Sequence, residues 1–139
     1  MSFNWNSVNI FIRPDSSSNK PKVFIDPDIS TFTVENKASQ GDGDSHSLAV
    51  EKKNNKIILT GKIGKSSKEV VFYKNIQDPD IWAGENLKLF LSHRHITVTG
   101  EVKNKKSPAT AELVAEYESK PIEAILADMN KFSNNYVAE

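Results

Sequence analysis

The chain has 139 residues, in which 18 lysines and arginines balance 18 aspartates and glutamates. This balance gives no summed field that would attract a nucleic acid backbone or an anionic membrane. Cysteine is absent, which excludes disulfide crosslinks, thiolate metal sites and a cysteine nucleophile. No basic and apolar leader opens the chain, and no apolar run approaches the roughly 20 residues that span a bilayer, so we expect a cytoplasmic protein.

Alternating apolar and polar residues predict short strands over most of the chain. The first is predicted over residues 7–13, and others follow at residues 22–25, 31–35, 47–51, 57–63 and 69–73. Gly61 and Gly100 lie within such patterns, where glycine usually marks a bulge or the close approach of another backbone. Residues 36–45, centred on Gly41-Asp42-Gly43-Asp44, are predicted to form an exposed, mobile loop.

Residues 85–102 have the pattern of a β-hairpin. Leu87, Leu89 and Leu91 alternate with other residues, and after the sequence His93-Arg94-His95 the alternation resumes at Ile96 and Val98. Pairing Leu91 with Ile96 would place all five aliphatic residues on one face, which we expect to be buried.

The C-terminal residues change to a helical period. Ile122, Ile125, Leu126, Met129 and Phe132 recur at intervals of three and four, which predicts one amphipathic helix over residues 121–134. Asn134-Asn135 is a suitable helix end. Such an apolar stripe must be covered, and we expect the helix to dock on the sheet, with an apolar partner surface as the alternative.

No motif of established chemistry is complete. His93 and His95 would point the same way on a strand and could chelate a metal, with a third ligand from Asp44, His46 or Glu101. The hairpin register instead places His93 in or beside the turn, where the imidazole has no fixed partner, so we predict no metal site and no cofactor. Asp42 and Asp44 lack the remaining ligands of a calcium loop. Gly-x-Ser-x-Gly, a phosphate loop and His-Glu-x-x-His do not occur, which lowers the expectation of an enzyme.

A tryptophan in a predicted loop is the strongest recognition signal. Trp82 follows Asp78-Pro79-Asp80-Ile81, and a loop tryptophan is either a lid over the core or an anchor for a protein or sugar. The candidate binding residues are Asp80, Trp82, Glu85, Phe90, His93, Arg94 and His95.

These patterns predict one all-β domain over residues 1–139, an antiparallel β-sandwich or barrel of about eight or nine strands with one C-terminal helix. The strands are expected within residues 7–118. A barrel closed by a late helix resembles lipocalin-like carriers in outline, although their Gly-x-Trp signature is absent around Trp5.

For function, the sequence favours a non-catalytic recognition module of the immunity, inhibitor or assembly-subunit type. Its expected partner is a protein or a glycan, and self-association into a homo-oligomer is left open. The first alternative is a barrel that carries a small hydrophobic ligand. The second is a metal-dependent or hydrolytic enzyme that uses His93 and His95.

Overall fold

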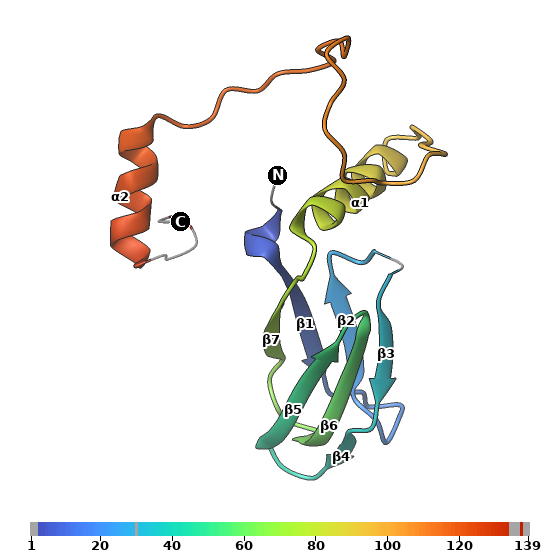
Figure 1. Cartoon of the computed structure of the whole chain (residues 1–139). Coiled ribbons are helices and arrows are strands. Elements are labelled where there is room, and N and C mark those ends of the chain that lie inside the picture. Colours follow the sequence, from blue (N-terminus) through green and yellow to red (C-terminus); the bar gives the residue numbers. More distant parts are fainter. Residues whose placement is uncertain (1–2, 30, 134–136, 138–139) are drawn as a thin grey trace. The chain divides into compact units, whose positions relative to one another are not determined.

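The computed structural model describes residues 3–29, 31–133 and 137, and the chain divides into two compact units, Met1–Asn104 and Lys105–Glu139 (Figure 1). The single domain expected over residues 1–139 stays a prediction. The first contains every described strand and helix α1, and the second contains helix α2.

Two small sheets build the first unit. One is antiparallel, with β1 (Ser7–Arg13) between β2 (Lys22–Asp26) and β7 (Val70–Asn75). The other is mixed and centred on β6 (Lys56–Gly64), which pairs along one edge with antiparallel β5 (His46–Lys53). The opposite edge of β6 pairs in parallel with β3 (Thr33–Asn36) and then with β4 (Ser39–Gly41). The predicted strands at these places are therefore confirmed to within a few residues.

The two sheets share one apolar core because buried and less buried side chains alternate along their central strands, β1 and β6. In β1, residues Val8, Ile10 and Ile12 are completely buried while the residues between them are only partly covered. Ile10 and Ile12 form one cluster with the buried residues Ile57, Leu59 and Ile63 of β6, whereas Val8 packs in a second cluster with Ile29 and Trp82. A one-residue shift in either strand would turn these side chains to water, so the burial pattern fixes the register.

The predicted antiparallel sandwich or barrel is wrong. Two of the three pairings that β6 makes, those with β3 and β4, are parallel, and no closed barrel forms within the described residues. The predicted loop at residues 36–45 is corrected as well, because β4 lies inside it and Ala38 is buried in the core. This strand of three residues was not predicted because the segment is polar and rich in glycine.

The predicted hairpin at residues 85–102 is replaced by helix α1, Pro79–Ser92. Pro79 occupies the first turn, where its missing N–H costs nothing, and the residues that follow include the good helix formers Ala83, Glu85, Lys88 and three leucines. The buried positions of the helix are Trp82, Ala83 and Asn86, and Leu89 packs partly buried on the same side. These buried positions recur with the spacing of a helix, but the polar side chain of Asn86 interrupts the hydrophobic pattern that would have predicted it. Leu87, Ile96 and Val98, expected in the core, are exposed.

The sequence His93-Arg94-His95 ends α1 instead of turning a hairpin. The His95 N–H donates to the Ser92 carbonyl and the Ile96 N–H to the Leu91 carbonyl, at 2.9 and 3.0 Å. His95 has a positive φ of 60°, as the residue after a helix often does.

Gly61 confirms the predicted close approach of another backbone. Its φ is +101°, and a Cβ atom there would lie 1.9 Å from the carbonyl oxygen of Ser47 on β5. Gly100 has no atom within 4 Å of the same position, so the expected close approach is absent at this glycine.

Helix α2, Ile122–Phe132, confirms the predicted C-terminal helix over its described residues. None of its residues is buried, and Ile122, Leu126 and Phe132 of its apolar stripe are exposed. Docking of this stripe on the sheet stays a prediction. Residues 134 and 135, the predicted helix end, lie outside the described residues. No helix of the described chain is both long enough and apolar enough to cross a membrane.

Candidate functional site

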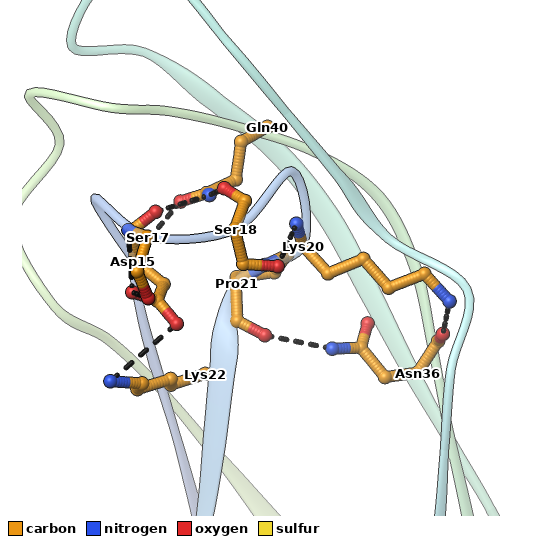
Figure 2. A network of polar contacts seen from close by, with 8 residues as sticks. All are labelled: Asp15, Ser17, Ser18, Lys20, Pro21, Lys22, Asn36 and Gln40. Carbon is orange, nitrogen blue, oxygen red and sulfur yellow. Dashed lines mark hydrogen bonds and ion pairs between the residues drawn. The ribbon is translucent and has the colours of Figure 1, made fainter.

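The loop between β1 and β2 is held by two amide side chains from β3 and β4 (Figure 2). Gln40 accepts a hydrogen bond from the Asp15 N–H at 2.7 Å and donates to the carbonyls of Asp15 and Ser18 at 2.8 and 2.6 Å. Asn36 donates to the Pro21 carbonyl at 2.8 Å. Each amide satisfies backbone groups that have no strand partner, so these contacts explain how a loop of turn-forming residues is fixed.

The same loop contains a serine and a lysine three residues apart, Ser17 and Lys20, which point to different partners (Figure 2). The Ser17 hydroxyl donates to a carboxylate oxygen of Asp15 at 2.7 Å, and Lys20 Nζ donates to the Asn36 carbonyl at 3.3 Å. The hydrogen bonds from Ser17 are the main cause that lowers the pKa of Asp15. An activated serine needs its base within hydrogen-bond reach. Ser17 and Lys20 therefore have the geometry of a loop contact and not of a nucleophile with its base.

Trp82 and Glu85 lie on α1 and line a cavity of about 130 Å³. The sequence predicted Trp82 on a loop, but the residue lies on the helix and is 4 % exposed. Its ring meets Phe32 edge to face at a centroid distance of 5.7 Å. This is the arrangement that the lid alternative describes. Asp80, two residues before Trp82, accepts a hydrogen bond from Asn104 at 3.0 Å.

The remaining candidate binding residues lie at the far end of α1. Phe90 and His93 line a wider hollow of about 510 Å³ with Phe3, whose ring meets that of Phe90 at 5.6 Å. Arg94 and His95 follow the helix and are exposed. The structure thus divides the seven residues among separate places along α1 and the residues that follow it, and their role in binding stays a prediction. Among the described residues, no group of three or more histidines and carboxylates could hold a metal ion.

The end of α2 presents a serine in an uncommon backbone conformation. Ser133 has φ 48° and ψ 47°, the left-handed region, and its N–H donates to the Met129 carbonyl. Asparagine or glycine usually takes this position, and another residue there carries strain of about 1–3 kcal/mol, which often marks a functional position. Ser133 is exposed, and Asn134-Asn135 follows it in the sequence.

A serine hydroxyl at such a position can donate and accept a hydrogen bond at once, which suits it to passing a proton or orienting a substrate. The sequence had suggested only a helix stop here, so Ser133 is the functional candidate that pattern reasoning missed. The available signal was the triplet Ser133-Asn134-Asn135 at the end of an amphipathic helix, which by itself is weak.

Three comparisons relate the chain to known proteins. A family model described as the D-Ala-D-Ala carboxypeptidase 3 (S13) family matches residues 3–139. Penicillin-binding protein 4 from Haemophilus influenzae, in a complex with a β-lactam, is similar in structure with a TM-score of 0.66 and 20% identity. A second structure of that protein has a TM-score of 0.65 and 21% identity. No protein with a curated description matches the sequence.

The matches cover 99% of this chain in both structures but 33% and 31% of the solved chains. The chain therefore spans about a third of the length of these structural neighbours, and at this identity the likeness concerns the fold.

Proposed function

Because the chain belongs to the D-Ala-D-Ala carboxypeptidase 3 (S13) family, we propose that it forms part of an enzyme that removes the terminal D-alanine from peptides ending in D-Ala-D-Ala. In this proposal the chain contributes Ser133 and Asn135 to the active site. The family match, which extends through these two residues, is the observation that carries this proposal.

Family membership corrects the function favoured from the sequence. The match to a peptidase family over residues 3–139 contradicts the predicted non-catalytic module of the immunity, inhibitor or assembly-subunit type. It also contradicts the prediction of carbohydrate binding and the lowered expectation of an enzyme. The carrier alternative lacks its barrel, as the sheet pairings show. The family is hydrolytic, but the residue we connect with its chemistry is not one of the histidines in the sequence His93-Arg94-His95.

The sequence motifs support Ser133 in particular. Penicillin-binding proteins and class A β-lactamases carry a Ser-x-x-Lys motif with the nucleophile, a Ser-Asp-Asn motif and a Lys-Thr-Gly motif. Ser133-Asn134-Asn135 matches the second motif at its first and third positions and has asparagine where the motif has aspartate. Lys-Thr-Gly does not occur in the sequence.

The Ser-x-x-Lys spacing occurs once, at Ser17 and Lys20, whose side chains have separate partners in the β1–β2 loop. Ser17 is therefore not the nucleophile in this proposal. In this proposal the serine that is acylated lies in the part of the enzyme that this chain does not span, and Ser133 acts beside it. There the Ser133 hydroxyl holds or passes the proton that the leaving amine requires.

The test is the release of D-alanine from a peptide ending in D-Ala-D-Ala, measured on the protein as its source organism makes it. Ser133→Ala should lower kcat/KM by about 10²-fold or more, the range for loss of a group that transfers or orients a proton. Because Ser133 is exposed, the melting temperature should change little.

Two matched variants sharpen this test. Ser119→Ala removes another exposed hydroxyl, whose only described hydrogen bond is to the Lys120 carbonyl, and should leave activity intact. Ser17→Ala should also keep full activity. Full activity in Ser133→Ala would refute the role of Ser133, and absence of D-alanine release by the unmodified protein would refute the proposed reaction.

A further inference from the structure

Two hollows lie between strands β5 and β7 of the first unit, and we call the space along these two strands the edge groove. A hollow of about 300 Å³ near the start of both strands is lined by Asp44, His46, Ser66, Lys68, Glu69 and Val70. A second hollow of about 550 Å³ near their ends is lined mainly by Val50, Glu51, Lys52, Tyr73, Lys74 and Asn75. The strands thus run in the same direction along the groove. At about 3.3 Å per residue, the stretch from His46 to Lys52 gives room for roughly six extended residues.

Both strands are open sheet edges. Among the described residues, β5 pairs with β6 alone and β7 pairs with β1 alone. Each strand therefore leaves a row of backbone N–H and C=O groups on the side away from its partner. An extended peptide is the ligand whose own backbone matches such a row, whereas a compact small molecule would meet only one or two of its groups.

The charges along the groove favour an anionic peptide. Lys68 and Lys74 have no carboxylate within 4.0 Å among the described residues, whereas Lys52 Nζ lies 6.0 Å from the centroid of the Phe32 ring. The acids are mostly occupied, since Glu51 pairs with Lys53 at 3.1 Å and Glu69 pairs with Arg13. Asp44 is left as the one lining carboxylate in this part of the chain without an ion pair, so cations are in excess.

We propose that this edge groove binds an extended peptide that carries free carboxylates, which adds as a strand beside β7 with Tyr73 as its aromatic contact. Tyr73 is 69 % exposed, so its ring is available to a ligand. The identity of the peptide rests on the proposed function, because peptides ending in D-Ala-D-Ala carry a free terminal carboxylate. The groove would then hold substrate peptides through residues of the first unit, whereas Ser133 belongs to the second.

The probe is a fluorescein-labelled hexapeptide of alternating valine and glutamate, and its binding is followed by fluorescence anisotropy. Tyr73→Ala should weaken binding by about tenfold, as expected when a central aromatic contact is lost. Phe24→Ala is the matched control, because Phe24 is a 46 % exposed aromatic on β2, the opposite edge strand of the same sheet. Phe24→Ala should leave binding unchanged, and the same hexapeptide with lysine in place of glutamate should bind more weakly.

Equal effects of the two variants, equal binding of the lysine peptide, or no binding at millimolar concentration would each overturn the proposal. An unlabelled pentapeptide ending in D-Ala-D-Ala should displace the probe, and failure to displace it would overturn the link to substrate. Ser133→Ala should bind the probe as the unmodified protein does. The result therefore holds whether or not D-alanine is released, which separates this proposal from the proposed function.

Discussion

Replacement of Trp82 tests the packing of α1 on the sheets. The side chain is 4 % exposed and packs with Val8 and Ile29. A buried tryptophan removes about 150–250 Å² from water, so Trp82→Ala should lower the free energy of unfolding by about 3–5 kcal/mol. In a unit of this size that corresponds to a fall of more than about 10 °C in Tm.

A second variant isolates the ring from its polar atom. The indole Nε1 is buried and has no hydrogen-bond partner among the described residues. A buried donor without a partner costs about 1–3 kcal/mol, so removing it offsets part of the stability that is lost with the smaller side chain. Trp82→Phe keeps an aromatic ring beside Phe32 and should cost less than about 1 kcal/mol.

Urea denaturation followed by circular dichroism measures both variants, because the signal does not depend on the tryptophan itself. Tyr73→Ala, at an exposed aromatic in the same unit, serves as the control and should change the free energy of unfolding by less than about 0.5 kcal/mol. A loss below about 1 kcal/mol for Trp82→Ala would refute the packing described here. Equal losses for alanine and phenylalanine would show instead that the Nε1 hydrogen contributes to stability.

Two further predictions concern the mixed sheet. Gly61→Ala should destabilise the unit by at least about 2 kcal/mol in the same denaturation assay, because of its positive φ and the Ser47 carbonyl, whereas Gly100→Ala should have little effect. Hydrogen bonds from Lys56 and then Lys37 lower the pKa of Glu35 from 4.5 to about 2. A lowered folded pKa gives stability that is complete above 4.5 and lost as the pH falls toward 2, so the stability difference between the protein and Glu35→Gln should close over that interval. A difference that stays constant with pH would contradict this cause.

The strands could be predicted from the sequence because each buries one face. In β1 and β6, alternation of aliphatic residues such as Ile10 and Leu59 reports that face directly. How the strands pair could not be predicted, because the parallel contacts of β3 and β4 with β6 depend on backbone hydrogen bonds that leave no period in the sequence.

Helix α1 was missed for a specific reason. Leu87, Leu89 and Leu91 alternate as in a strand, but only Leu89 shares the side of the helix that Trp82 and Asn86 bury. Asn86 is completely buried and donates to the Trp82 carbonyl at 2.8 Å, so a polar residue occupies a core position in the pattern. Period alone cannot reveal such a position.

The candidate site was hidden for a different reason. Ser133 followed by two asparagines reads as an ordinary helix end, since asparagine is common there. The motifs that would give the triplet meaning are absent or misplaced in this sequence, because Lys-Thr-Gly does not occur and Ser17 lies in a loop. The match to a peptidase family supplied the context that the triplet lacks.

The most direct test of the account is the rate of acylation by a β-lactam, measured from the mass of the intact protein as its source organism makes it. One solved structural neighbour is a complex with a β-lactam, which makes this class of compound a suitable probe. The account predicts one covalent adduct per molecule in the unmodified protein, unchanged acylation in Ser17→Ala and Ser119→Ala, and acylation slowed by about 10²-fold in Ser133→Ala. An adduct that disappears in Ser17→Ala, or forms at the normal rate in Ser133→Ala, would contradict it.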